Sequence, residues 1–166
     1  MTVHHAATAL HFPLHKPGFE DITAAARDAV AASGVQNGIL TVYSQHTTCA
    51  VLIQEESMDQ TLDGVEFLLQ DMVDCLTSLV PTCRHEGQYL HPGTKHLEYA
   101  TETLGEEGWW SLNTDAHLRS VLLGRSQTIP VIDGRLELGA FGRIYFADFD
   151  AMRQRDRTAR FTVIGE

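Results

Sequence analysis

The chain has 166 residues, of which 43% are hydrophobic, and it carries a formal net charge of −10 from 22 acidic and 12 basic residues. That size and composition predict one globular domain over residues 1–166. The acidic balance argues against a general nucleic-acid binder, because phosphate backbones require a basic surface. No apolar run approaches the roughly 20 residues that cross a bilayer, and the start lacks a signal-peptide layout, so we expect a cytoplasmic protein with no membrane partner.

The N-terminal region has the pattern of a strand followed by a helix. Thr8–Leu14 is typical of a strand, and apolar residues from Phe19 to Val30 recur at helical spacing. Gly34 then provides a left-handed helix stop. We therefore predict a strand over residues 8–14 and a helix over residues 19–33.

Two apolar runs, Ile39–Tyr43 and Ala50–Ile53, predict the next two strands. The polar residues between them would lie at a surface rim held by a rigid scaffold, where binding residues are often found. There His46 could serve as a ligand or a base, and the hydroxyls of Thr47 and Thr48 could bind phosphate or orient the ring. The alternative is a polar connection with a hydrogen-bonded histidine and no further role.

A long helix is predicted next, because apolar residues recur at alternating spacings of four and three. Ser57 and Gln60 have the spacing of a capping box at its start, and Pro81 ends it. The residues of the apolar stripe are Met58, Leu62, Val65, Leu69, Met72, Leu76 and Leu79.

Acidic residues gather where this helix would begin. Acids in a first helical turn are favoured by the helix dipole. Asp63 would lie in the second turn, where the dipole explains it less well, and Glu55 directly follows the strand that leads away from His46. Glu55 and Asp63 are therefore candidate catalytic carboxylates.

Residues 82–112 are irregular, and the rest of the chain is mainly β. The predicted elements are a short helix from Asn113 or Thr114 to Leu123, a hairpin over 128–138 with its turn at Asp133-Gly134, and strands over 144–149 and 157–164. Gly139 and Gly142 indicate a bulge or a close approach of the backbone. Together the elements predict an α+β fold with about seven strands, largely antiparallel, and two main helices.

Histidines in separate segments are candidates for a metal site. Asn113 and His117 would project from one helix face, although Asn113 also suits an N-cap. His91 and His96 flank a Pro-Gly pair. Three neutral imidazoles could hold a divalent ion and leave a position open for water or substrate.

Arg153, Arg155 and Arg157 alternate, so on a strand they would share one face. Their forked donors could bind a phosphate group there. The alternative is that alternating charge protects an edge strand against aggregation.

Several of these segments, in this order, resemble motifs of the YjbQ-like family, whose members are often described as secondary thiamine-phosphate synthases. The resemblance extends over residues 8–165 and rests on the ordered set rather than on any one piece. The segments are GILTVYSQHTTCAVLIQEE (38–56), YLH (89–91), NTDAHLRSVLLGRS (113–126), IPVIDGRLELG (129–139) and FADFDAMRQR (146–155).

The resemblance implies two packed sheets, a homotrimer, and a site near a subunit interface where histidines bind a metal or an anion. The metal ligands would be His46, His91 and His117, and the sequence leaves open whether His96 or His85 takes the place of His91. The implied catalytic residues are His46, Glu55, Asp63 and Asn113, and the implied phosphate-binding residues are Thr47, Thr48, Arg153 and Arg155.

The activity that the resemblance implies is a low-efficiency transfer of the thiamine-phosphate synthase type. It would join a pyrimidine pyrophosphate to a thiazole phosphate with help from a divalent metal, zinc or magnesium. Two alternatives stay open: a metal-dependent phosphate-ester hydrolase, and a non-enzymatic trimer that binds a metal or a metabolite. The last is slightly favoured by one departure, since Gly139–Gly142 reads Gly-Ala-Phe-Gly where the family usually has Gly-Thr-Trp-Gln.

Overall fold

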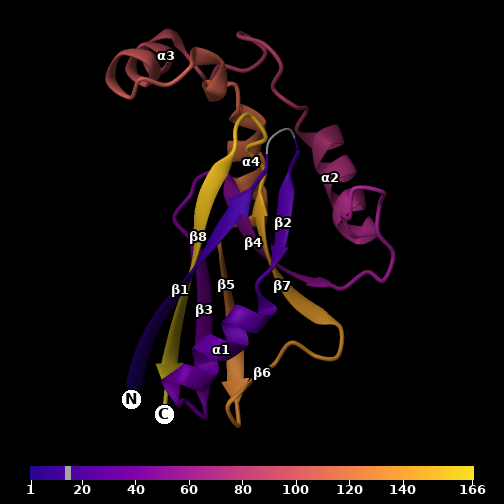
Figure 1. Ribbon diagram of the computed structural model, residues 1–166, viewed down its shortest axis with the longest axis vertical. Helices are drawn as coiled ribbons and strands as arrows, with labels where there is room; N and C mark the ends of the chain where they lie inside the picture. The colour runs from indigo at the N-terminus through magenta and orange to yellow at the C-terminus, as the bar shows by residue number, and fades with distance from the viewer. Residues whose placement is uncertain (14–15) are drawn as a thin grey trace.

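A computed structural model describes residues 1–13 and 16–166 of the chain. Their eight strands form two antiparallel sheets, one of five strands and one of three, and the helices lie around them (Figure 1). The expected α+β sandwich with two main helices is therefore confirmed. Every helix among the described residues is too short or too polar to cross a lipid bilayer.

The larger sheet has the strand order β1-β8-β3-β5-β6. Its inward side chains alternate with outward ones, so that on β8 residues 157, 159, 161 and 163 are buried. The predicted turn between β5 and β6 is confirmed, because Asp133 and Gly134 both have positive φ. The strand bounds are Thr2–Phe12 (β1), Gly38–Ser44 (β3), Ser126–Ile132 (β5), Arg135–Leu136 (β6) and Arg155–Gly165 (β8).

The smaller sheet, β2-β7-β4, is covered on both faces. On its central strand, Ile144 and Phe146 face the core shared with the larger sheet, whereas Tyr145 and Ala147 face a second core under the helices. This double burial explains why the strand reads as a continuous apolar run. The bounds are Gly18–Asp21 (β2), Cys49–Glu55 (β4) and Gly142–Asp148 (β7).

Three of the helices complete the two cores. Helix α1 (Thr23–Ser33) contributes Ala26, Ala29 and Val30 to the core between the sheets. Helices α2 (Phe67–Leu79) and α4 (Thr114–Leu123) cover the smaller sheet from outside. Beyond them, α3 (Thr94–Glu98), a π turn (Tyr99–Thr103) and a 3-10 turn (Gly108–Ser111) form a segment at the top of Figure 1.

The first helix begins later than predicted. The helical spacing suggested a start at Phe19, but residues 18–21 pair with β7 as strand β2 and the helix begins at Thr23. Edge pairing with a distant strand overrides the local pattern here. The first strand runs over residues 2–12 rather than 8–14, and Leu14 lies outside the described residues.

The second helix was also predicted too long. It begins at Phe67, and the side chains of Met58 and Leu62, expected in its core stripe, are 88% and 108% exposed. The predicted capping box is wrong, because the carboxylate of Glu66 accepts the Ser57 backbone N–H at 2.7 Å and the Tyr145 hydroxyl at 2.8 Å. These tertiary bonds hold residues 57–66 as a loop.

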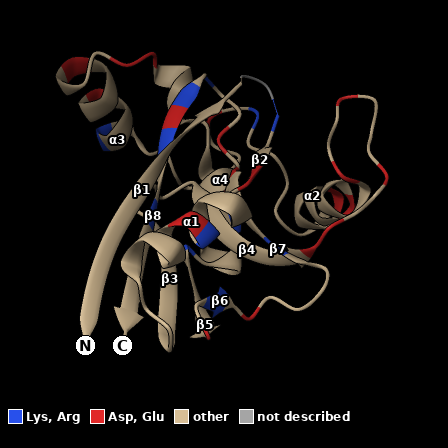
Figure 2. Cartoon of the chain, turned by 60° about the horizontal axis from the view of Figure 1, so that its bottom comes forward, with Lys and Arg blue, Asp and Glu red and all other residues tan. Residues whose placement is uncertain are grey.

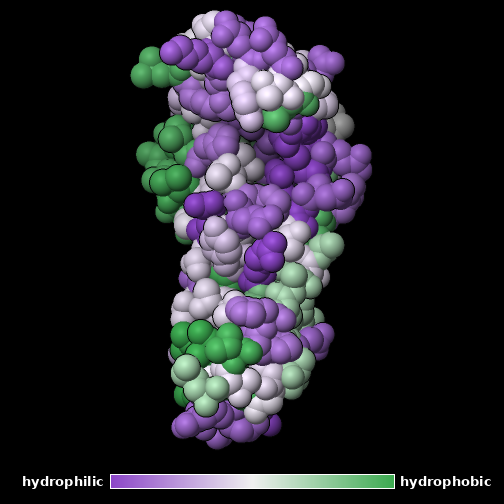
Figure 3. Space-filling model, turned by 90° about the vertical axis from the view of Figure 1, so that its left-hand side faces the viewer, coloured by the Kyte–Doolittle hydropathy of each residue, from purple (hydrophilic) through white to green (hydrophobic). Residues whose placement is uncertain are grey.

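The predicted close approach at Gly142 is confirmed, because a Cβ there would lie 2.2 Å from the Leu138 carbonyl oxygen. Arg155 and Arg157 lie on β8 and Arg153 precedes it; residues 155–158 pair with β1 alone, because β3 joins β8 only from Ala159 onward. The side that carries β1 and β8 in Figure 1 is mainly hydrophilic, with hydrophobic patches along one edge and toward the end that holds both chain termini (Figure 3).

Candidate functional site

Ends of several elements surround a polar cleft of about 340 Å³. The pairings of Ser44 with Ala159 and of Cys49 with Asp148 bring the loop after β3 and the segment before β8 together. The segment before α4 forms the opposite wall. The lining residues are Gln45, His46, Thr47, Thr48, His96, Glu106, Trp110, Ser111, Asn113, His117, Asp150, Arg153, Arg155 and Arg157.

His46 lies in this cleft and is also fixed by a hydrogen bond. The backbone N–H of Thr158 donates to its Nε2 atom over 3.1 Å, so the ring proton must be on Nδ1. Burial, together with the nearby guanidinium of Arg157, lowers the pKa of His46 below its ordinary value. The imidazole is therefore a neutral part of the cleft wall, and its Nδ1–H is a donor.

A buried carboxylate, Asp148, organises the floor. Its oxygens accept from Nε and Nη2 of Arg157 at 2.7 and 3.2 Å, and the Thr48 hydroxyl lies 3.4 Å from Oδ1. The Asp150 backbone N–H also donates to it, at 3.0 Å. One carboxylate thus holds parts of three segments in place.

Asp150, two residues on, has a parallel role. Its carboxylate pairs with Arg155 and accepts from Nδ2 of Asn113 at 3.2 Å. Asn113 is the N-cap residue of α4, as predicted, but its side chain makes no cap hydrogen bond to the helix. Asn113 instead joins the start of α4 to the arginine segment.

The third arginine is held differently. Arg153 pairs with Glu106, and its guanidinium carbon lies 4.2 Å from the centre of the Trp110 ring. Both partners come from the segment before α4, where the sequence pattern predicts no regular element. The Nε atoms of Arg153 and Arg155 are buried without a hydrogen-bond partner among the described residues. Unpartnered buried donors are costly, so these two atoms are points where the site lacks an acceptor.

Three histidines cluster at the cleft, where His96 and His117 line it and His91 lies against both. The ring of His91 lies 4.5 Å from that of His96 and 5.6 Å from that of His117, measured between ring centres. Nδ1 of His117 lies 3.2 Å from the Thr47 carbonyl oxygen and donates to it as the ring N–H. Burial lowers the pKa values of His91 and His117, so both are neutral near pH 7.

The donor set of this cluster suits zinc more than magnesium, because neutral imidazole is a good zinc ligand. Nε2 of His91 is buried without a hydrogen-bond partner, as a ligand atom would be. As the side chains lie, however, no group of three or more His, Cys, Asp or Glu in residues 1–13 and 16–166 is placed to hold an ion. Of the expected ligands, His91 and His117 lie together, with His96 beside His91 rather than in its place. His46 lines the same cleft as His117 but has its Nε2 engaged by Thr158, and the exposed His85 bonds the Glu86 carbonyl.

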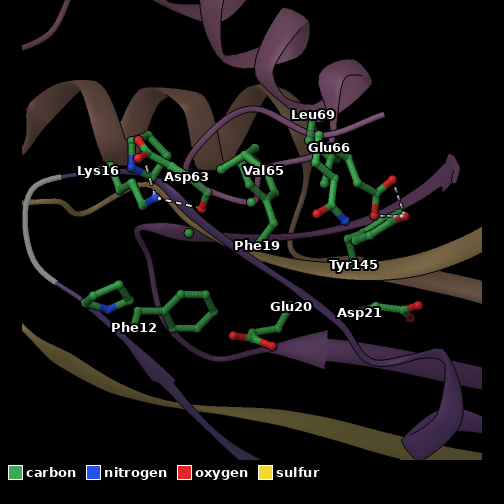
Figure 4. Close-up of a pocket in the computed structure, with 15 residues that line it drawn as sticks. Phe12, Lys16, Phe19, Glu20, Asp21, Asp63, Val65, Glu66, Leu69 and Tyr145 are labelled. Atoms are coloured by element: carbon green, nitrogen blue, oxygen red, sulfur yellow. Dashed lines mark hydrogen bonds and ion pairs between the residues drawn. The ribbon is translucent and has the colours of Figure 1, made fainter. Parts of the chain in front are cut away.

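Two expected carboxylates lie away from the cleft. Glu55 ends β4, roughly 20 Å of strand from Cys49 at its other end, and lines a shallow hollow with Met58 and Phe67. Asp63 lines a separate cavity of about 290 Å³, where its carboxylate lies 3.8 Å from Nζ of Lys16 (Figure 4). Neither residue can act on a ligand in the cleft of this chain.

The acidic excess of the chain is concentrated on that distant side. Residues 55–74 contain seven acidic residues and no Lys or Arg, and red marks this loop and α2 in Figure 2. In the cleft, by contrast, each of the three arginines is paired with one carboxylate. The negative net charge of the whole chain therefore does not argue against anion binding in the cleft, because most of the excess acidic residues lie elsewhere.

Sequence reasoning missed the carboxylates and the aromatic residue of the site. Asp148 and Asp150 are separated by one residue, as are Arg155 and Arg157, and this matched spacing was an available signal. Glu106 and Trp110 belong to an irregular segment whose position no periodicity indicates. Only the tertiary structure places them against Arg153.

A known protein family matches most of the chain. The model of the family described as "UPF0047 protein YjbQ-like" matches residues 9–166. The chain belongs to the YjbQ family. A YjbQ-family relative, the UPF0047 protein of Methanothermobacter thermautotrophicus, is 35% identical over 88% of this chain and 82% of its own length. The UPF0047 protein of Archaeoglobus fulgidus is 34% identical over 72% of this chain and 74% of its own.

Solved structures show the same YjbQ fold. A YjbQ/UPF0047-family protein of Clostridium acetobutylicum has 27% identity and a TM-score of 0.70, over 96% of this chain and 99% of its own. A YjbQ-like protein of Sulfolobus solfataricus has 21% identity and a TM-score of 0.73, over 99% of both chains, which supports the fold alone.

Proposed function

We propose that this chain binds the phosphate or pyrophosphate group of a small metabolite in the arginine cleft and acts as a transferase of the thiamine-phosphate synthase type. The observation that carries the proposal is the convergence of Arg153, Arg155 and Arg157 on one cleft, with buried Nε donors of two of them unpartnered. Guanidinium groups bind phosphate through paired donors and keep their charge at neutral pH.

In the proposed reaction, a bond forms between the thiazole nitrogen and the methylene carbon of the pyrimidine substrate. The carbon–oxygen bond to pyrophosphate breaks at the same carbon, and pyrophosphate takes the electron pair. The arginines would stabilise the charge that develops on this leaving group. Thr47 would supply a hydroxyl at the same wall, Thr48 would hold Arg157 and Asp148 in place through its hydroxyl, and neutral His46 could donate its Nδ1–H to a ligand oxygen.

A zinc ion is part of the proposal, with His91, His96 and His117 as its ligands after a change in their side-chain orientations. When bound, such an ion supplies a Lewis acid for phosphoryl oxygens or an activated water. The roles given above to the arginines, the hydroxyls and His46 do not depend on it.

The second candidate is hydrolysis of a phosphate ester. The histidine cluster beside the arginines favours it, because neutral imidazoles can accept a proton from an attacking water. The third candidate, a non-enzymatic binding protein, was favoured by the replacement of the Thr-Trp-Gln segment. Gly142, in that segment, pairs with Glu55, at the opposite end of β4 and β7 from the Cys49–Asp148 pair that borders the cleft. The replaced Thr-Trp-Gln segment therefore lies outside the cleft of this chain.

The test is an assay with the pyrimidine pyrophosphate and the thiazole phosphate, followed by quantification of thiamine phosphate and of free pyrophosphate. His46→Ala is the control. Equal amounts of thiamine phosphate from the two proteins would sink the transferase proposal. Metal-dependent release of phosphate from simple esters would instead support the hydrolase, and pyrophosphate binding without turnover would support a binding protein.

The homotrimer and the cytoplasmic location expected above are kept as part of this proposal. Light scattering of the purified chain tests the assembly. A monomeric mass at micromolar concentration would remove the homotrimer from it.

A further inference from the structure

We infer that Arg153 is the residue that selects phosphate over singly charged ligands, and that Glu106 occupies the ligand's position on Arg153 until a phosphate displaces it. The inference rests on the proposed function, because it concerns the anion that the cleft receives. It assigns a specificity role to Glu106 and Trp110, which belong to the segment between α2 and α4.

The three ion pairs of the cleft are not equivalent. The carboxylates of Asp148 and Asp150 are each 1% exposed, and both also accept hydrogen bonds from other segments, Asp148 from Thr48 and Asp150 from Asn113. The side chain of Glu106 is 26% exposed, and Arg153 is its one hydrogen-bond partner among the described residues. Two of the pairs are therefore built into the floor, whereas the third is open to exchange with solvent anions.

Arg153 remains in position without Glu106, because Trp110 supports its guanidinium. The guanidinium carbon lies 4.2 Å from the ring centre, which is the distance of a stacked cation–π contact. Its Nε is buried and unpartnered among the described residues. A ligand that replaced Glu106 would thus find an oriented guanidinium with donors still to satisfy.

The exchange favours doubly charged groups. A carboxylate ligand offers Arg153 the same charge and the same two oxygens as Glu106, and gains nothing by displacing it. A phosphate or pyrophosphate group carries more negative charge and more acceptor oxygens, which can reach Arg155 at the same time. Glu106 therefore acts as a built-in competitor that weaker anions cannot remove.

The experiment is isothermal titration calorimetry of the full-length chain, which measures the dissociation constant for inorganic pyrophosphate and, separately, for acetate. The variants are Glu106→Gln, Arg153→Gln and, as a matched control, Glu107→Gln, which makes the same charge change at an exposed neighbouring residue. Glu106→Ala and a thermal melt of each variant guard against a folding defect.

We expect Glu106→Gln and Glu106→Ala to tighten pyrophosphate binding by about 3- to 10-fold, and Glu106→Gln to gain measurable acetate binding. Arg153→Gln should weaken pyrophosphate binding by about 10-fold or more, and Glu107→Gln should stay within about twofold of wild type. If wild type binds pyrophosphate and Glu106→Gln binds no tighter than Glu107→Gln, the inference is wrong and the proposed anion site stands. If neither wild type nor any variant binds pyrophosphate, the inference and the proposed anion site both fail. Tighter pyrophosphate binding by the Glu106 variants, without any turnover by wild type, supports the inference and removes only the transferase activity from the proposed function.

Discussion

Asp148 and Arg157 form a two-pronged ion pair that is almost fully buried, with side chains 1% and 8% exposed and 2.7 Å between Oδ2 and Nε. The pair joins the end of β7 to the start of β8, and Nη2 of Arg157 also reaches the Thr48 hydroxyl at 3.2 Å. Because a buried charge needs its partner, this contact fixes the geometry of the cleft more firmly than the partly exposed pair of Arg153 and Glu106 does.

Replacing Asp148 should therefore be costly. Asp148→Asn removes the charge that compensates the buried Arg157, and we expect the free energy of unfolding to fall by about 3–5 kcal/mol. Urea denaturation measures this change.

The matched control is Asp156→Asn, since Asp156 pairs with His11 at 2.8 Å but its side chain is 91% exposed. Its effect should stay below about 1 kcal/mol. Equal effects of the two substitutions would contradict the structural role given to the buried pair.

The stability of the fold should fall as the pH drops below neutrality, in part through His46. Its pKa in the folded chain is lowered from the ordinary 6.5, and its Nε2 must stay unprotonated to accept the Thr158 N–H. Below pH 6.5 the unfolded chain therefore binds this proton more readily than the folded one, so stability is complete above that pH and is lost as the pH falls toward the folded-state pKa.

Thermal melts of wild type and His46→Gln between pH 8 and pH 5.5 test this prediction, over a range spaced about the ordinary histidine pKa. The variant should lose less stability over this range, because glutamine does not titrate. An unchanged slope in the variant would mean that other groups cause the pH dependence.

The corrected start of α2 predicts different costs for two leucines of the same sequence stripe. Leu69 is 3% exposed in the core under α2, so Leu69→Ala should lower the free energy of unfolding by about 2–5 kcal/mol. Leu62 is fully exposed in the preceding loop, so Leu62→Ala should change it by less than about 0.5 kcal/mol. Urea denaturation measures both changes, and a large loss of stability in Leu62→Ala would contradict the later helix start and support the longer helix.

The proposed zinc ligands can be tested by elemental mass spectrometry of untagged protein. About one ion per chain is expected for wild type and for His85→Ala, because His85 is exposed outside the cluster. His96→Ala should lose most of the metal. Metal retained equally by all three proteins would exclude this cluster, and no metal in wild type would remove zinc from the proposal and leave the arginine cleft as the site.

Where a local pattern is enough to specify structure, the sequence predicted it well. The turn at Asp133-Gly134 follows from the two positive φ angles that such residues tolerate, and the end of α1 at Gly34 has the same cause. The strands on either side of His46 also follow, because their apolar runs are long enough to require burial. The block at residues 45–48 was correctly placed at a rim for that reason.

The tertiary structure alone decided which partner each polar group finds. The pattern at residues 57–66 is compatible with a helix, but the bonds of Glu66 to Ser57 and Tyr145 hold it as a loop. Likewise Glu106 reaches Arg153 across 47 residues, and no periodicity encodes such a contact. Hydrogen bonds and ion pairs between distant segments depend on how the sheets and helices pack. The carboxylates that pair with the three arginines, and the contact of His91 with His96, could therefore be found only in three dimensions.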